Sequence, residues 1–97
     1  MATYLVLFNL TEQGVRDIKS APDRIRRNAE ATASRGAKVV SWYLTMGQYD
    51  AAAIIEAPDD ATLAAGLLAL GAQGNVRTTT LRAFSLEEFE KIVGAIP

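Results

Sequence analysis

Two strand-like runs follow one another directly in the middle of the chain, between residues 37 and 57. The first run, Ala37 to Met46, alternates its side chains between two faces, as a strand does. The second run, Tyr49 to Ala57, returns after Gly47-Gln48, a pair that suits a type II′ reversal with glycine first. The sequence therefore predicts an antiparallel hairpin here.

An apolar strand and an interrupted helix precede the hairpin. Thr3 to Leu10 is apolar on both faces, which suits a buried central strand. Thr11 offers an N-cap hydroxyl for the helix that follows. Pro22 interrupts that helix, because proline lacks an N–H and disfavours helical geometry in the residue before it. The helix should resume there and end near Gly36, so we expect it in two pieces.

A second helix follows the hairpin. Pro58-Asp59-Asp60 opens it with an aspartate cap, and Gly71 and Gly74 end it. Gly66 lies inside this helix, where glycine costs about 1 kcal/mol relative to alanine. We therefore expect Gly66 to mark close packing against the sheet.

A last strand and a terminal helix complete the chain. Val76 to Phe84 is rich in β-branched residues and predicts a strand. Ser85 and Glu88 have the spacing of a capping box. The amphipathic helix that this box predicts has an apolar stripe of Leu86, Phe89, Val93 and Ile96.

The order of these elements is β-α-β-β-α-β with an added helix, which predicts an α+β, ferredoxin-like fold in one domain, residues 1–97. In that arrangement the first and third strands are central in a four-stranded antiparallel sheet, and both crossovers are right-handed. The helices cover one face of the sheet, so in a monomer the other face should be polar.

The residues do not supply such a polar face. Simple alternation in the second strand leaves outward either Trp42, Leu44 and Met46 or Val39 and Tyr43. An apolar face of this kind usually marks an interface. We therefore expect two sheets to pair into a dimeric α+β barrel, as a homodimer or higher homo-oligomer, with Phe89 and Val93 sealing its rim.

The chain has no cysteine and no histidine. Thiol nucleophiles, Cys/His zinc sites, haem ligation through these residues and imidazole acid–base chemistry are therefore excluded, and we expect no cofactor and no metal. No apolar run is long enough to span a bilayer, so the expectation is a cytoplasmic protein without a membrane partner. The densest basic cluster, Arg24, Arg26 and Arg27, is too narrow for nucleic acid, and a solvated helix face explains it better.

Tyr49 and Asp50 form the candidate site. Neighbours in a strand point to opposite faces, so one of them should face the helices and the other the open face. Asp50 needs a partner, and turn amides or an arginine would satisfy it without any function. The functional alternative is a cavity between sheet and helices for a small polar metabolite, with ligand-binding residues Arg24, Tyr43, Gly47, Tyr49, Asp50 and Arg82.

Five short motifs occur in this order over nearly the whole chain: TEQG, APDR, YLTMGQYD, EAPDD and GNVRTTTLRAF. Together they resemble the GYD domain family, named for a glycine, a tyrosine and an aspartate that correspond here to Gly47, Tyr49 and Asp50. The resemblance implies a small bacterial protein of uncharacterised function, with a ferredoxin-like fold in the dimeric α+β barrel group.

A second likeness involves TMGQYDAAAIIEAPD and GNVRTTTL, which are similar to the effector-binding module of the leucine- and asparagine-responsive transcription regulators. That likeness implies a stand-alone sensing module that binds an amino acid at a subunit interface near the hairpin.

Three functions fit these residues: a homo-oligomeric small-ligand-binding module, a cofactor-free isomerase, lyase or monooxygenase, and a purely structural assembly unit. The enzyme would use Asp50 as base and Tyr43 or Tyr49 as acid.

Overall fold

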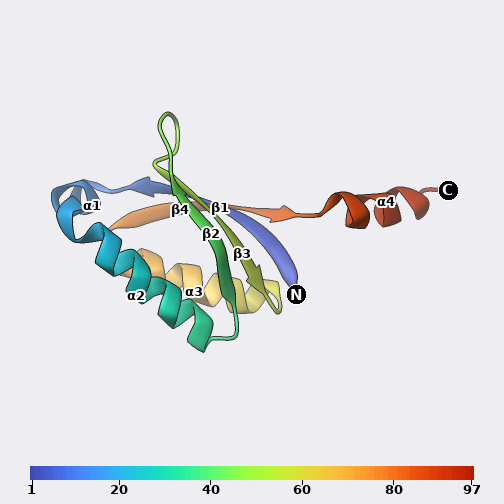
Figure 1. Ribbon diagram of the computed structural model, residues 1–97, viewed down its shortest axis with the longest axis horizontal. Coiled ribbons are helices and arrows are strands. Elements are labelled where there is room, and N and C mark those ends of the chain that lie inside the picture. Colours follow the sequence, from blue (N-terminus) through green and yellow to red (C-terminus); the bar gives the residue numbers. More distant parts are fainter.

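The computed structural model describes residues 1–97 and contains four strands, four α-helices and one 3₁₀ turn (Figure 1). The strands and helices confirm the predicted order. Their bounds are β1 Ala2–Leu10, α1 Glu12–Arg16, η1 Ile18–Ser20, α2 Ala21–Ser34, β2 Lys38–Leu44, β3 Ala51–Ala57, α3 Asp60–Ala72, β4 Val76–Ala83 and α4 Leu86–Gly94.

The four strands form one sheet in the order β2-β3-β1-β4, with every neighbouring pair antiparallel. This is the ferredoxin-like arrangement, with β1 and β3 central. Figure 1 shows α2 and α3 on one side of the sheet, while α4 extends away from it beyond the end of β4. No helix is both long and apolar enough to cross a membrane.

The core lies between the sheet and the helices on that side. Every second residue of β1 is buried there, namely Tyr4, Val6 and Phe8. The register places these side chains opposite Ile55, Ala53 and Ala51 of β3. Alternation along β1 and β3 thus builds one buried face, and most of the buried residues of β3 are alanines.

Strand β2 departs from simple alternation. Val39 pairs with Ile55 and Ser41 pairs with Ile54, so an extra residue, Val40, is inserted between them as a bulge. The predicted division of β2 into two faces is therefore wrong. Beyond the bulge the pattern is shifted by one residue, and Val39 and Trp42 both face the helices.

The connection between β2 and β3 is longer than predicted. Strand β2 ends at Leu44 and β3 begins at Ala51, so Tyr49 and Asp50 precede the strand instead of belonging to it. The N–H of Thr45 donates to the carbonyl of Asp50 at 2.9 Å, which closes a loop over residues 46–49. The type II′ reversal at Gly47-Gln48 is therefore wrong, although Gly47 does have a positive φ of 120°. Asp50 instead bonds to β1, through its N–H to Phe8 and through its carboxylate to Leu10.

The first helix is broken as predicted, into α1, η1 and α2, with Pro22 in the first turn of α2. Gly66 of α3 differs from the expectation. A methyl group at Gly66 would meet only the guanidinium of Arg35, at 3.6 Å, and no atom of the sheet. Gly66 thus lies beside the Arg35 side chain of the neighbouring segment, and the prediction of close packing against the sheet is wrong.

Candidate functional site

A cavity of about 500 Å³ separates α2 from the helix-facing side of the sheet. Its wall is mostly apolar. The apolar side chains that contribute to it include Phe8 and Leu10 of β1, Ile25 of α2, Val39, Trp42 and Leu44 of β2, and Leu70 of α3. This volume lies within the range of about 300–1,000 Å³ typical of small-molecule sites in proteins.

Small side chains on both walls explain why the cavity exists. Helix α2 presents Ala21 and Ala29 toward it, and β3 presents Ala51 and Ala53. Alanine ends at Cβ, so these residues leave space between a helix and a sheet that larger side chains would fill. The cavity therefore results from the small side chains on its walls and not from a break in the backbone.

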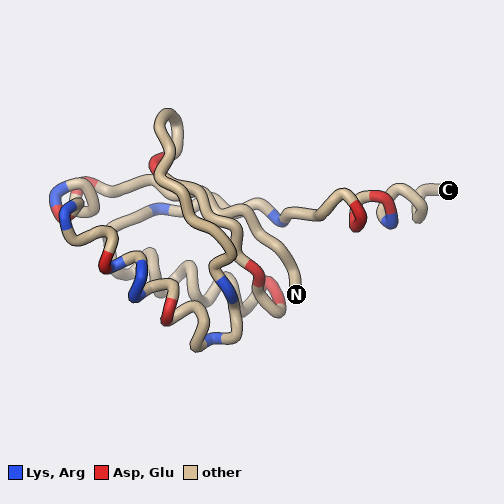
Figure 2. Tube along the Cα trace, in the orientation of Figure 1, with Lys and Arg blue, Asp and Glu red and all other residues tan.

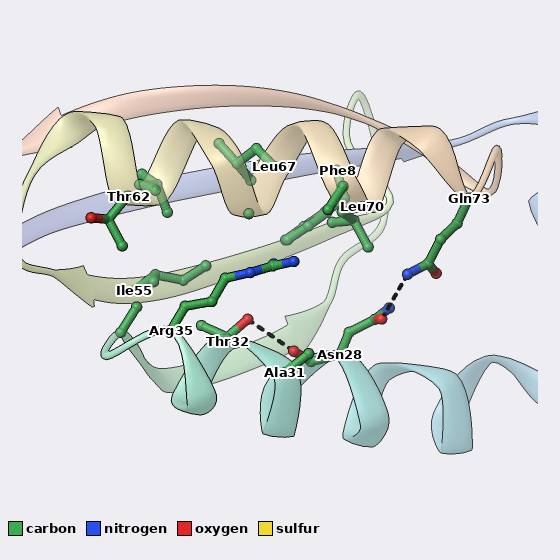
Figure 3. Close-up of a pocket in the computed structure, with 14 residues that line it drawn as sticks. Phe8, Asn28, Ala31, Thr32, Arg35, Ile55, Thr62, Leu67, Leu70 and Gln73 are labelled. Carbon is green, nitrogen blue, oxygen red and sulfur yellow. Dashed lines mark hydrogen bonds between the residues drawn. The ribbon is translucent and has the colours of Figure 1, made fainter.

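A smaller cavity of about 110 Å³ lies between α2 and α3 (Figure 3). The two cavities share part of their lining, including Phe8 and Leu70. A hydrogen bond of 3.1 Å from the Gln73 side-chain amide to Asn28 joins the two helices along this shared wall. Figure 3 shows the Arg35 side chain lying in the smaller cavity, between α2 and α3.

Asp50 lines the larger cavity and is fastened to β1 at two points. Its N–H donates to the carbonyl of Phe8 at 2.8 Å, and its Oδ2 accepts from the N–H of Leu10 at 2.8 Å. A backbone amide of β1, and not a turn amide or an arginine, is therefore the partner of this carboxylate. Asp50 thus fixes the 45–50 loop against the end of β1 while lining the cavity.

Arg24 lines the same cavity from α2 and is half-buried. Its guanidinium donates to the hydroxyl of Ser20 at 3.0 Å. The ion pairs of the structure join Arg16 with Glu12 and Arg26 with Asp23, so Arg24 has no carboxylate within ion-pair distance. Figure 2 shows that lysines and arginines gather along α1 and α2.

Of the six residues predicted to bind a ligand, only Arg24 and Asp50 line this cavity. Tyr43 is 64% exposed and pairs with Ala52, so it lies on the opposite face of the sheet. Gly47 lies at the exposed loop, and Tyr49 is half-buried outside the cavity lining. The base and either tyrosine of the enzyme alternative are therefore not brought together within the cavity.

Arg82, the sixth residue, lies on β4 directly opposite Tyr4. Its guanidinium stacks over the rings of Tyr4 at 5.5 Å and Phe84 at 4.4 Å, and it donates to the carbonyl of Thr3 at 3.1 Å. Asp50 bonds at Phe8, and Tyr4 lies four residues away along β1, or roughly 13 Å at about 3.3 Å per residue. Arg82 and Asp50 therefore belong to different ends of the sheet.

The three residues whose pKa is shifted, Tyr4, Asp59 and Glu88, lie outside the cavity lining. The hydroxyl of Tyr4 donates to Asp60, and that hydrogen bond, together with burial, raises the pKa of Tyr4. The amide of Thr62 donates to Asp59 and lowers the pKa of this N-cap carboxyl. The amide of Ser85 likewise lowers the pKa of Glu88 in the capping box of α4.

Trp42 and Phe8 are the largest side chains of the cavity, and sequence reasoning did not assign them to a site. The bulge at Val40 determines that Trp42 points toward the helices, and the alternation of side chains in this strand does not predict the bulge. A usable signal was the run of alanines in β3, since small residues in a central strand opposite a helix with Ala21 and Ala29 leave room for a ligand.

Comparison with known proteins gives a family, a named relative and similar solved structures. The model of the GYD domain matches residues 4–93. A Thermus thermophilus protein named glutamine synthetase and cystathionine beta-lyase binding protein is 37% identical over 89 residues, which cover 91% of this chain and 94% of that protein.

Solved structures also resemble the chain. The crystal structure of TTHA0845 from Thermus thermophilus is 28% identical with a TM-score of 0.55, and the match covers 88% of this chain and 95% of that one. The crystal structure of MtbAldR is 21% identical with a TM-score of 0.68, over 87% of this chain. The chain spans 52% of MtbAldR, and this likeness shows the fold alone.

Proposed function

The chain belongs to the GYD domain family, and we propose that it acts as a homo-oligomeric module that binds a small ligand in the cavity between α2 and the sheet. The observation that carries this proposal is a cavity of about 500 Å³ whose wall is mostly apolar and includes both Arg24 and Asp50. Apolar walls with a few polar groups are typical of sites for small molecules.

Filling the cavity tests this function directly. Ala29→Leu adds three carbon atoms to a half-buried position of α2 on the cavity wall. In a thermal-shift screen of a metabolite library, we expect ligands that raise the Tm of the wild type to lose this effect on Ala29→Leu. The matched control is Ala33→Leu, because Ala33 lies on the same helix but is exposed and outside the cavity lining.

A ligand that stabilises wild type and Ala29→Leu equally would place binding elsewhere. The same screen with Asp50→Asn examines the carboxylate. Asparagine keeps an oxygen that can accept from Leu10 but has no charge, so a ligand that needs the charge should stabilise only the wild type. Asp17→Asn, at an exposed position away from the cavity, is the control.

Assembly through a second copy is the other part of the proposal. The sheet face opposite the helices carries Leu5, Leu7, Ile54 and Leu81, which the registers place on neighbouring strands. Ile54 and Leu81 are 40% and 49% exposed. Contiguous apolar surface of this kind usually belongs to an interface. The exposed stripe of α4 adds to it, and a homo-oligomer would cover both.

Binding of metabolic enzymes is a second candidate function, supported by the name of the Thermus relative and by α4. This helix extends from the body, and Leu86 and Phe89 in it and Ile96 just after it are more than half exposed. The test is biolayer interferometry of the full chain against purified glutamine synthetase and cystathionine β-lyase from the same organism. If the wild type binds and Phe89→Glu does not, this function is supported. If Phe89→Glu binds as tightly as the wild type, α4 is not the binding surface.

A further inference from the structure

Two arginines line the cavity, and Arg24 is the one that has no carboxylate within ion-pair distance. This limits the ligand that the cavity can hold. We propose that the ligand is an amphipathic oxyanion, namely an apolar body with a carboxylate, and that the guanidinium of Arg24 binds the carboxylate. This inference rests on the proposed small-ligand function and adds the chemical class.

Arg24 differs from the other arginines of α2. Arg26 also lines the cavity, but it is exposed and pairs with Asp23 at 3.1 Å. Arg27 is exposed and lies outside the lining. Arg24 is half-buried, and its bond to the hydroxyl of Ser20 uses one NH1 donor and supplies no negative charge. A guanidinium has five N–H donors in a fixed fork, so donors remain for a carboxylate.

Asp50 is the opposite charge of the cavity, and its bonds give it a structural role. Its Oδ2 accepts from Leu10 and its own N–H donates to Phe8, so the residue already connects the 45–50 loop to β1. A ligand carboxylate would be repelled by Asp50 and attracted by Arg24. The expected pose therefore places the ligand's oxyanion at α2, with a neutral part of the molecule near Asp50.

The apolar residues of the cavity wall indicate that the rest of the ligand is apolar. Phe8, Ile25, Trp42 and Leu44 line the same cavity as Arg24, and they offer an apolar and partly aromatic surface. An aromatic or branched aliphatic body gains about 25 cal/mol for each Å² that it removes from water there. A purely polar metabolite would gain nothing from this wall and would lose its hydration.

The experiment compares three probes with one phenyl body: 3-phenylpropionate, 3-phenylpropionamide and 3-phenylpropylamine. Trp42 is the only tryptophan of the chain and lines the cavity, so its indole N–H gives a single reporter signal in ¹⁵N-labelled protein. We expect the carboxylate to bind about tenfold more tightly than the amide, which corresponds to ~1.4 kcal/mol, and the amine to bind more weakly than both.

Arg24→Gln should remove this preference, so that the carboxylate and the amide bind equally. Arg27→Gln is the matched control on the same helix, and Arg35→Gln examines the arginine of the smaller cavity. Both controls should keep the tenfold preference. If Arg35→Gln abolishes it and Arg24→Gln does not, the assignment to Arg24 is overturned.

The outcomes separate the ligand class from the function itself. Equal binding of carboxylate and amide to the wild type, or tighter binding of the amine, would overturn the oxyanion class and leave the cavity as a binding site. If none of the three probes shifts the Trp42 signal at millimolar concentration, the ligand class is overturned. The small-ligand function fails only if the thermal-shift screen also finds no ligand that distinguishes the wild type from Ala29→Leu. Ala29→Leu should abolish every shift, which confirms that the signal reports the cavity.

Discussion

At the scale of single residues, Asp50 combines two tasks that its side chain and backbone divide between them. The backbone N–H reaches Phe8 and the carboxylate reaches Leu10, so one residue satisfies two groups at the end of β1. Its position also places a carboxylate on the cavity wall. The effect of a substitution therefore depends on whether the new side chain can accept a hydrogen bond, and not only on its charge.

Asp50→Ala should lower the free energy of unfolding by about 1–3 kcal/mol, because it leaves the N–H of Leu10 without its acceptor. Asp50→Asn should cost less, since the amide oxygen can replace Oδ2. Urea unfolding followed by the fluorescence of Trp42 measures both values. Equal losses for the two variants would show that the charge, and not the hydrogen bond, provides the stability.

Tyr4 gives the molecule a sensitivity to alkaline pH. The pKa of Tyr4 is raised above 10.0, first by its hydrogen bond to Asp60 and then by burial. A raised pKa means that the folded state favours the protonated phenol. The resulting stability is fully present below the unfolded pKa and is lost as pH rises toward the folded pKa.

As the pH rises past about 10, the ordinary pKa of tyrosine, the Tm of the wild type should therefore fall more steeply than that of Tyr4→Phe, which cannot lose this proton. Differential scanning fluorimetry over this range measures the two slopes. Parallel slopes would show that other groups cause the alkaline loss.

At the scale of elements, helix α1 is held by a polar contact with the α3–β4 connection. Thr11 donates its N–H to the carbonyl of Asn75 at 3.0 Å and its hydroxyl to the carbonyl of Gly74 at 2.6 Å. The side-chain amide of Gln13 donates to Asn75 at 3.0 Å. These contacts explain the TEQG and GNV motifs, which keep the start of the first helix in place and so position α2 beside the cavity.

Gly14 is required by this contact. A methyl group there would lie 2.1 Å from the carbonyl oxygen of Asn75, which is far inside van der Waals contact. Gly14→Ala should therefore destabilise the protein, although alanine is about 1 kcal/mol better than glycine in a helix. Gly71→Ala is the control, because nothing lies within 4 Å of its added methyl, and we expect it to be neutral or stabilising. The Tm of both variants in thermal unfolding tests this prediction. A higher Tm for Gly14→Ala than for the wild type would mean that α1 can move away from Asn75.

At the scale of the whole molecule, the chain leaves two apolar surfaces uncovered. One is the sheet face with Leu5 and Ile54, and the other is the stripe of α4, where Phe89 is 55% exposed. A helix of this length is marginal in water on its own, even with the capping box of Ser85 and Glu88. Both surfaces fit a chain that is completed by another copy.

Size-exclusion chromatography with light scattering should therefore give the mass of a dimer or a higher oligomer at micromolar concentration. Leu81→Glu on the sheet face and Phe89→Glu on α4 should shift the protein toward the monomer, because each places a charge in an apolar interface. Leu68→Glu is the control, since Leu68 is equally apolar and 75% exposed but lies on α3. A monomeric wild type would rule out the homo-oligomer.

Short-range patterns in the sequence were enough to predict the strands and helices and their order along the chain. The central position of β1, the caps at Thr11 and Asp59, the helix that resumes around Pro22 and the capping box at Ser85 are all present as expected. Each of these depends on residues close together in the chain, where hydrogen-bond donors and side-chain periodicity act directly. The family followed from motifs in the same way.

The candidate site could be predicted only in part, because it depends on contacts between distant segments. Arg24 and Asp50 line one cavity because α2 packs beside β2, next to β3. Arg82 is separated from them by the register of β4 on β1. The bulge at Val40 turns Trp42 toward the helices, and β3 begins only after Asp50, whose carboxylate accepts from the N–H of Leu10.

The sequence by itself thus determined the order of strands and helices, because short-range hydrogen bonding and periodicity encode it. Only the tertiary structure decided that Asp50, and not Tyr49, lines the cavity, and that small side chains on facing elements leave space beside Arg24. Register, bulges and unfilled volume arise from packing between segments that are far apart in the chain, and no local pattern specifies them.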